Sequence, residues 1–281
     1  MSTLRLRGDL PERVDLLNIT PLALSGLSEA EAGKLAIGTS RRGLTLGDVF
    51  EISLDGSDSL VIEGGSSRLD RVGAALSQGS IRVEGDVGQR LGEGMAAGSL
   101  TVTGSAGPYA GTGATGGTIT IEGDAGDHAG GAVYAGKAGL DGATLVIKGA
   151  AGDHLGDRMR RGMILAGSAG AFAASRMIAG TIVVSGALGD HPGYGMRRGT
   201  LVAGSHGTLL PTFVETGTPR PRLRPAAGPE PQASRRGAGQ PSQRHAAALL
   251  RRSRDARQGR TVRSGLIRHD FSERRRQVAE K

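Results

Sequence analysis

Three Gly-Asp-His units recur along the chain, and their residue types are those of metal sites and acid–base catalysts. The units are Gly126–His128, Gly152–His154 and Gly189–His191. Three imidazoles can hold a zinc ion at about 2.0–2.1 Å from each nitrogen, and aspartates can orient such ligands. Whether the three histidines can meet depends on the elements that carry them.

The units are part of a longer repeat, marked by glycines that close short apolar runs such as LVIEG, IRVEG and ITIEG. Successive markers are separated by 21, 19, 19, 26, 18, 19 and 18 residues. The markers are Gly64, Gly85, Gly104, Gly123, Gly149, Gly167, Gly186 and Gly204. A second column stands three residues after the markers and includes Gly88, Gly107, Gly126, Gly152, Gly170 and Gly189. The alternating, β-branched runs between these glycines predict short strands.

A repeat of about 19 residues cannot bury its own apolar side, but stacked repeats can, with strands about 4.8 Å apart. We therefore predict an all-β protein, a single-stranded parallel β-helix of seven to eight coils over residues 60–215, with a small cap over residues 1–59. Equivalent residues should then stack into columns. Ten residues after the markers, one interior column would contain Met95, Met159, Met177 and Met196, with Val133, Ala114 and Ala74 in other coils.

Stacking separates the three histidines. Each follows its marker glycine by five residues, in a column that also holds Arg90, Tyr109, Phe172 and Leu209. His128 and His154 would lie one coil apart, and His191 two coils beyond His154, roughly 10 Å away. One ion cannot reach all three, so we predict a structural ladder, with no metal site and no catalytic residue in this chain. A ligand shared by His128 and His154 is the alternative, and no Ser-His-Asp order emerges.

Two glycine-rich stretches imitate nucleotide-binding motifs. Gly111–Gly116 matches GxGxxG but opens no helix, and Gly131–Lys137 approaches a phosphate loop but is followed by Ala138 instead of Ser or Thr. The glycine repeat accounts for both matches, and we reject them. The 26-residue interval predicts a loop inserted near Tyr134–Asp141.

Arginines recur at one turn of the repeat, two coils apart: Arg158, Arg160, Arg161, Arg197 and Arg198. Such exposed arginines can simply keep the solenoid soluble, or the strip could hold an anionic ligand arm or an acidic partner. The net charge of +8 arises elsewhere. Residues 216–281 carry 17 Lys and Arg against 5 Asp and Glu, which leaves 18 basic and 22 acidic side chains, a charge of −4, in the other 215 residues. The body therefore offers no basic face for nucleic acid.

The period is lost abruptly at residue 216. Residues 216–281 are rich in Pro, Arg, Gly and Ser, which predicts a disordered, low-complexity tail. We hypothesise a shifted reading frame, with a genuine basic tail as the alternative. The chain has no Cys, no signal-peptide pattern and no run of about 18 apolar residues, so we predict a cytoplasmic protein without a membrane partner.

The recurrent pattern GDxGxxxGxxMxxG resembles the C subunits of formylmethanofuran dehydrogenase and of the bacterial formyltransferase/hydrolase complex. It is seen in GDVGQRLGEGMAAG, GAAGDHLGDRMRRG and GALGDHPGYGMRRG, and the segments GDVFEI and GSHGTLLPTF also fit. The resemblance covers roughly Leu44 to Val214 and, more weakly, residues 1–43. The β-helix domain of the glutamate synthase large subunit shares the glycine pattern.

The resemblance implies a right-handed β-helix that acts as a non-catalytic scaffold beside the A, B and D subunits of a one-carbon complex. That complex would use a methanofuran-like carrier and tetrahydromethanopterin, with zinc, and molybdenum or tungsten in the redox form, in partner subunits. Composition favours the hydrolase form, which releases formate. The arginine turns would contact the polyglutamate arm of the carrier. The alternatives are a stand-alone glutamate-synthase-type domain with a structural or regulatory role, and a carbohydrate-cleaving β-helix enzyme.

Overall fold

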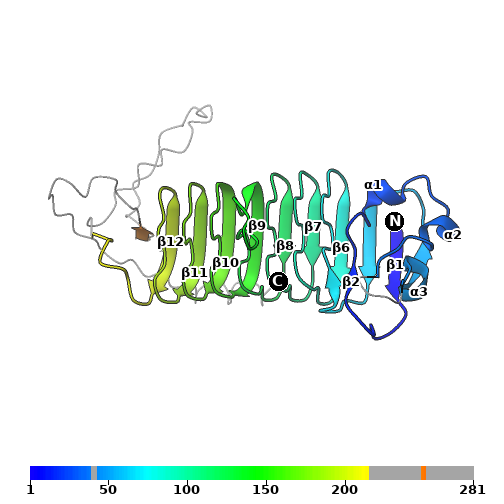
Figure 1. Ribbon diagram of the computed structural model, residues 1–281, viewed down its shortest axis with the longest axis horizontal. Coiled ribbons are helices and arrows are strands. Elements are labelled where there is room, and N and C mark those ends of the chain that lie inside the picture. The colour runs from blue at the N-terminus through cyan, green and yellow to red at the C-terminus, as the bar shows by residue number, and fades with distance from the viewer. Residues whose placement is uncertain (39–42, 215–247, 251–281) are drawn as a thin grey trace, which may run out of the picture.

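The structure is a computed structural model that describes residues 1–38, 43–214 and 248–250. The chain winds into a parallel β-solenoid of about eight turns, which confirms the predicted fold class. Each turn contributes one strand to an 11-stranded sheet that runs along the long axis of the molecule (Figure 1). The order along the sheet is β13-β12-β11-β10-β9-β8-β7-β6-β4-β1-β3. Sequence order thus equals spatial order from β4 to β12, as stacked repeats require.

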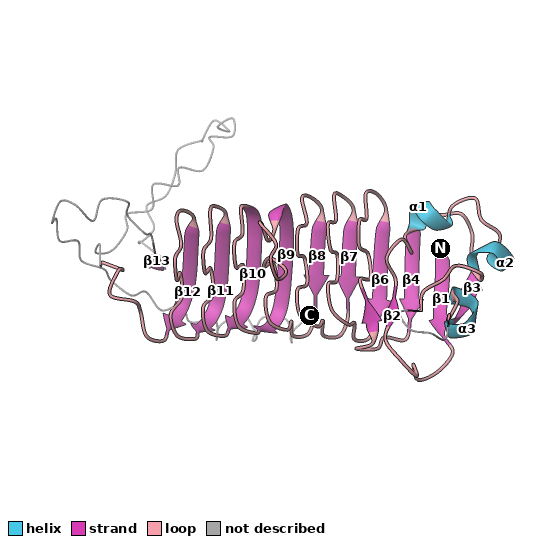
Figure 2. Ribbon diagram, viewed as in Figure 1, coloured by secondary structure: helices cyan, strands magenta, loops and turns pink. Residues whose placement is uncertain are grey.

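The regular elements are short, and almost all of them are strands (Figure 2). The strands of the large sheet are β1 (Ser2–Leu6), β3 (Phe50–Ser53), β4 (Ser59–Glu63), β6 (Ser80–Glu84), β7 (Ser99–Val102), β8 (Thr118–Ile121), β9 (Asp141–Ala151), β10 (Arg161–Ala169), β11 (Thr181–Leu188), β12 (Thr200–His206) and β13 (Ala248–Leu250). A separate two-stranded sheet joins β2 (Val14–Asp15) to β5 (Leu69–Asp70). The helices are α1 (Pro21–Leu24), α2 (Glu29–Ala32) and α3 (Leu46–Val49).

The strands form because β-branched and aliphatic residues alternate with polar ones, so that one side of each strand faces the interior. In the parallel register, one inward position passes from Leu60 through Ile81, Leu100 and Ile119 and continues through later coils. The members of this column are at most 1% exposed: Leu60, Ile81, Leu100, Ile119, Leu145, Ile164, Ile182 and Leu201. Each buried aliphatic side chain contributes about 1.5–3 kcal/mol relative to an exposed one.

The four methionines of the predicted column lie fully buried in the interior, at Met95, Met159, Met177 and Met196. The hydrogen bonds between coils define the rest of that column. The carbonyl oxygen of Met177 accepts from Arg197 N at 2.8 Å, and that of Met159 accepts from Ile178 N at 2.8 Å.

By the same hydrogen-bond pattern, the positions assigned to Ala74 and Val133 belong instead to Leu76 and Leu140. The carbonyl of Leu76 accepts from Ala96 N, and that of Leu140 accepts from Arg160 N. Ten residues after the marker was therefore the wrong count in these two coils. Both have longer intervals, of 21 and 26 residues, and the extra residues precede the column position. The 26-residue coil carries its insertion as a loop before β9, as predicted.

The second glycine column marks places where adjacent coils come too close for a side chain. A Cβ atom at Gly189 would lie 2.6 Å from Ala171 N, and one at Gly126 would lie 2.8 Å from Pro108 N. Gly88, Gly107, Gly152 and Gly170 would meet atoms of the preceding coil in the same way. These glycines recur because backbone fills the space where Cβ would stand.

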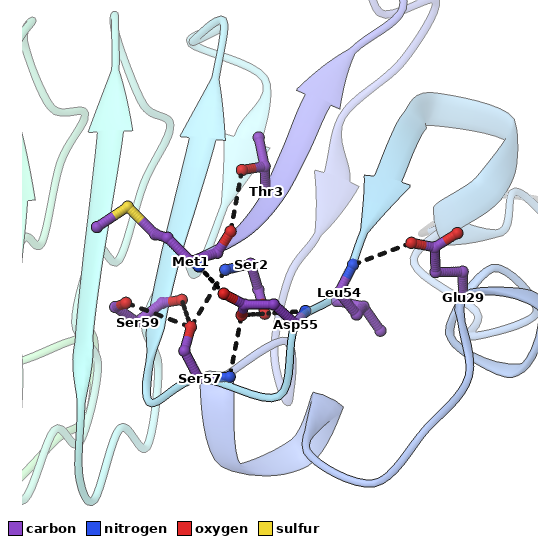
Figure 3. Close-up of polar contacts among 8 residues, drawn as sticks. All are labelled: Met1, Ser2, Thr3, Glu29, Leu54, Asp55, Ser57 and Ser59. Atoms are coloured by element: carbon purple, nitrogen blue, oxygen red, sulfur yellow. Dashed lines mark hydrogen bonds and ion pairs between the residues drawn. The ribbon is translucent and has the colours of Figure 1, made fainter.

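The N-terminal segment covers one end of the solenoid, and β1 pairs with the first strands there. Strand β1 is parallel to β4 and antiparallel to β3. Figure 3 shows how the chain end is fixed: the Met1 ammonium group pairs with the carboxylate of Asp55, which also accepts from Ser2 Oγ at 3.0 Å. The same carboxylate accepts from Ser57 N at 3.0 Å. The sheet ends at β3 on this side, and helices α2 and α3 contact that strand.

Ser28 caps α2 with a capping box, because its hydroxyl accepts from Glu31 N while Glu31 accepts from Ser28 N. The segment GLTLGDVFEISLDG alternates polar and apolar residues, which predicts a pair of strands. That prediction is half wrong, because the first half of the segment forms α3 and only the second half forms β3. The Asp48 carboxylate accepts from Thr45 N at 2.8 Å, and this bond favours a helical start over a strand.

Within residues 1–38, 43–214 and 248–250, no helix is long and apolar enough to cross a membrane. The prediction of a low-complexity tail at 216–281, and with it the hypothesis of a shifted reading frame, concerns residues that lie outside the described ones, apart from β13. Strand β13 pairs antiparallel with β12.

Candidate functional site

The aspartates of the three Gly-Asp-His units hold one coil to the next. Asp127 Oδ1 accepts from Asp153 N at 2.9 Å, and Asp153 Oδ1 accepts from Ala171 N at 2.7 Å. In the third unit Asp190 Oδ1 accepts from Thr208 N at 2.7 Å. This backbone hydrogen bond, with a side-chain bond from Thr208, lowers the pKa of the Asp190 carboxyl group. Each aspartate therefore satisfies a backbone N–H that the turn leaves without a strand partner.

The histidines of these units occupy a corner where the backbone turns through positive φ. The φ angles are 58° at His128, 60° at His154 and 55° at His191, and Tyr109 and Phe172 adopt the same conformation. Among residues with a side chain, His is enriched in this left-handed region. The corner N–H then points to the next coil, as when His128 N donates to Asp153 O at 2.8 Å. The repeated residue type thus fits a repeated backbone geometry.

The five corner side chains stack along the outside of the solenoid, and we call Tyr109, His128, His154, Phe172 and His191 the histidine ridge. Ring centroids lie 4.9 Å apart for Tyr109–His128, 4.7 Å for His128–His154 and 5.1 Å for His154–Phe172. The first three interplanar angles are 9°, 4° and 11°, and the last pair, Phe172–His191, is tilted by 50° at 5.4 Å. Phe172 separates His191 from the other two histidines.

Face-to-face stacking does not suit metal binding. The nitrogens of His128 and His154 lie in nearly parallel planes, at 4°, and so do not converge on one point between the rings. Among the described residues no group of three or more His, Asp or Glu side chains is placed to hold a metal ion. The geometry favours the structural interpretation of the ladder over a shared ligand.

The structure does bring a serine, a histidine and an aspartate together, which the sequence did not indicate. Ser175 Oγ donates to Asp157 Oδ1 at 2.7 Å and lies 3.4 Å from His154 Nδ1. In a catalytic triad the histidine stands between serine and aspartate and takes the serine proton. Here the serine stands in the middle, and its side chain is 1% exposed. The serine hydroxyl therefore donates to Asp157 and contacts His154 at the same time.

Asp157 is the centre of this cluster and is 2% exposed. Arg176 makes a two-pronged contact with it, Nε to Oδ1 at 2.9 Å and Nη2 to Oδ2 at 2.8 Å. Arg158 approaches the same carboxylate at 3.9 Å, and its Nη1 donates to the carbonyl of Gly136 at 2.6 Å. Sequence reasoning missed both Asp157 and Arg176, although Arg176 follows Arg158 by 18 residues, one coil interval.

A hollow of about 450 Å³ opens between the histidine ridge and the inserted loop. The loop forms one wall, the ridge another, and the Asp157 cluster lies between them. The lining residues are Tyr109, His128, Ala132, Val133, Tyr134, Ala135, Asp157, Arg158 and Arg176. It combines aromatic faces, small apolar side chains and two guanidinium groups.

The five arginines proposed as ligand contacts do not form one set. Arg158 is held inside the hollow, whereas Arg160, Arg161, Arg197 and Arg198 are exposed. Arg161 pairs with Asp141 at 3.1 Å. Because Arg197 N donates to Met177 O and Ile178 N donates to Met159 O, positions 160, 178 and 197 are equivalent. The two exposed pairs are thus two coils apart, with Ile178 and Ala179 between them.

The ridge makes stability depend on pH. Burial, and next the neighbouring His154, lower the pKa of His128 below 6.5, against smaller opposing effects of Asp157 and Asp127. As pH falls below 6.5, the unfolded chain therefore binds a proton at His128 before the folded chain does. We expect the melting temperature to fall from pH 7 to pH 5, and to fall less in His128→Asn. An identical pH slope in the two proteins, measured by circular dichroism melts, would contradict this assignment.

No protein-family model matches the chain. A curated relative, the C subunit of the formyltransferase/hydrolase complex Fhc of Methylorubrum extorquens strain AM1, is 99% identical over 219 residues, which are 78% of this chain and 83% of the relative. The C subunit of the molybdenum-containing formylmethanofuran dehydrogenase 1 of Methanosarcina barkeri is 38% identical over 78 residues, 26% of each chain.

A solved structure is also similar. A chain in the crystal structure of the formyltransferase/hydrolase complex FhcABCD from Methylorubrum extorquens, in complex with methylofuran, superimposes with a TM-score of 0.77 and 97% identity. The match covers 77% of this chain and 82% of that one. The resemblance seen in the glycine repeat is thereby confirmed over most of the chain: the protein belongs to the family of C subunits of formyltransferase/hydrolase complexes.

Proposed function

We propose that this chain is a non-catalytic scaffold of a complex with A, B and D subunits, which transfers a formyl group from a tetrahydromethanopterin carrier to a furan carrier and hydrolyses it to formate. The relative that is 97% identical is a chain of the FhcABCD complex, whose crystal structure contains methylofuran. The catalytic steps, and the zinc that they require, would belong to the partner subunits. The complex would act in the cytoplasm. The hydrolytic form is favoured over the redox form by the 99% identity to the hydrolase subunit.

The scaffold role is supported by the structural contacts that the polar residues of the repeat make. The aspartates of the repeat hydrogen-bond backbone N–H groups of the next coil, and the histidines stack on their neighbours. The one serine–histidine–aspartate contact found among the described residues is buried and in the wrong order for a nucleophile. These groups are occupied in holding a rigid, elongated body, whose flat strand faces can dock other subunits.

Omitting this chain from co-expressed subunits tests the proposal. We expect the remaining subunits to fail to co-purify as one assembly, and the isolated chain to show no formyl transfer or hydrolysis. Turnover of a formyl carrier by the isolated, folded chain would overturn the non-catalytic role. Normal assembly in its absence would overturn the scaffold role.

A second proposal concerns the exposed arginine pairs, which suit an anionic carrier arm that spans two coils. Changing Arg160, Arg161, Arg197 and Arg198 to Gln should raise the KM for the carrier roughly tenfold, since four exposed charge contacts contribute about 0.3–0.5 kcal/mol each. The matched control is Arg5→Gln with Arg82→Gln, at 62% and 53% side-chain exposure on the cap and on β6. Steady-state kinetics of the assembled complex provide the measurement, and an unchanged KM would remove this role.

A further inference from the structure

The hollow beside the histidine ridge stands at the largest break in the repeat. The coil between Gly123 and Gly149 has seven residues more than the common interval of 19. In the coil register Ala132 and Leu140 occupy consecutive positions of the regular coil, because Ala132 N donates to Asp157 O and Arg160 N donates to Leu140 O. The residues added to the coil are therefore 133–139, and they form the outer wall of the hollow.

Hydrogen bonds hold the loop that forms this wall in a defined conformation. Gly136 N donates to Val133 O at 2.8 Å, which closes a turn with Tyr134 at its tip. The carbonyl of Gly136 accepts from Arg158 Nη1, and Gly139 N donates to Arg158 O at 3.2 Å. The guanidinium is in turn positioned beside Asp157. The next coil thus fixes the loop in place over the ridge.

Residues typical of binding hot spots gather here. The chain has three tyrosines, and two of them, Tyr109 and Tyr134, line the hollow. The third, Tyr194, contacts Phe172 of the ridge edge-on at 6.0 Å and is 52% exposed. Tyr134 is 96% exposed, which leaves its ring without a role in the fold of this chain. Tyr and Arg in a preformed pocket are the residue types that carry most binding energy in protein interfaces.

We infer that the hollow is a docking pocket for a partner subunit, which inserts an apolar or aromatic side chain beside a carboxylate. The aromatic and small apolar lining selects the ring or aliphatic group. The charge selects the carboxylate, because two guanidiniums, of Arg158 and Arg176, face one buried Asp157 and leave a positive balance. The inference rests on the proposed scaffold role and names one surface that serves it, in addition to the flat strand faces.

The coil register defines which residues to delete in a first variant. Removal of residues 133–139, with Ala132→Gly, restores a 19-residue interval and places Leu140 in the interior column ten residues after Gly123. The glycine suits the position, since the equivalent Gly94 and Arg158 both have positive φ. The second variant is Tyr134→Ala. Because the wild-type tyrosine is 96% exposed, its replacement should affect binding and leave folding unchanged. The matched control is Leu22→Ala, a 49% exposed apolar side chain on α1 of the cap.

The assay is competition inside the whole complex. Each variant is co-expressed with the wild-type chain and the A, B and D subunits, the complex is purified through a tag on the A subunit, and the ratio of variant to wild-type chain is read by intact mass. We expect the deletion and Tyr134→Ala to be depleted at least about tenfold, and Leu22→Ala to be incorporated equally. Circular dichroism of each isolated variant checks its fold.

Equal incorporation of Tyr134→Ala would overturn the docking pocket, whatever the deletion does. If the complex still fails to assemble without this chain, the scaffold role stands and only the pocket falls. Depletion of Leu22→Ala to the same extent as Tyr134→Ala would also overturn the inference, since the loss would then not be specific to the hollow.

Discussion

Replacing Gly170 by alanine is expected to destabilise the solenoid by roughly 3 kcal/mol, because the new Cβ would enter the preceding coil. It would lie 2.2 Å from Asp153 Oδ1 and 2.9 Å from Asp153 N. Overpacking of this kind costs about 1–3 kcal/mol, and displacing Asp153 also breaks its hydrogen bond to Ala171 N, worth about 1.5–3 kcal/mol. In a chain of this size the melting temperature should fall by roughly 10 °C.

The control for this substitution is Gly94→Ala. Gly94 has φ +64°, but no atom would lie within 4 Å of a Cβ atom added there. Alanine at this position meets only backbone strain, about 1 kcal/mol. Thermal melts followed by circular dichroism compare the two variants. Equal destabilisation would contradict the claim that the close stacking of coils requires a glycine at position 170.

The second large effect is expected for Asp157→Asn, at roughly 2–3 kcal/mol. The amide can still accept from Ser175, but it removes the negative charge that Arg176 and Arg158 share. Breaking a buried pair costs about 3–5 kcal/mol, and we reduce this figure because the Arg176 side chain is 45% exposed.

Asp141→Asn is the matched control, since its partner Arg161 is 78% exposed and such surface pairs contribute less than about 1 kcal/mol. The free energy of unfolding in urea measures both variants. If Asp157→Asn were no more destabilising than Asp141→Asn, the cluster would not be what fixes the inserted loop and the ridge.

The sequence was most informative where spacing alone determines structure. A period of about 19 residues identified the stacked coils, the four buried methionines and the insertion, because side chains at equal positions of a solenoid share surroundings. The count failed at Leu76 and Leu140, where added residues lie between the marker and the column. At α3 it was the alternation of polar and apolar residues that misled, since a hydrogen bond from Thr45 N to Asp48 favours a helical turn there.

The cluster around Asp157 could not be predicted in this way. The repeat period places Arg158, Arg176 and Ser175 on neighbouring coils. The contacts of a long side chain depend on its direction and length, however, and the spacing of residues does not specify these. The same holds for the hollow, because its shape depends on how residues 133–139 turn back over the ridge. The resemblance to the C subunits identified the family, whereas these contacts required coordinates.

The most direct test of the central claim is the turnover of an assembled complex in which His128, His154 and His191 are all replaced by Asn. Asparagine tolerates the positive φ of these corners but cannot act as an imidazole base or as an imidazole metal ligand. If the histidines serve only the geometry of the solenoid, kcat per mole of assembled complex should stay within about twofold of the wild-type value. A loss of a hundredfold or more, in a complex that retains its normal set of subunits, would show that this chain takes part in the chemistry.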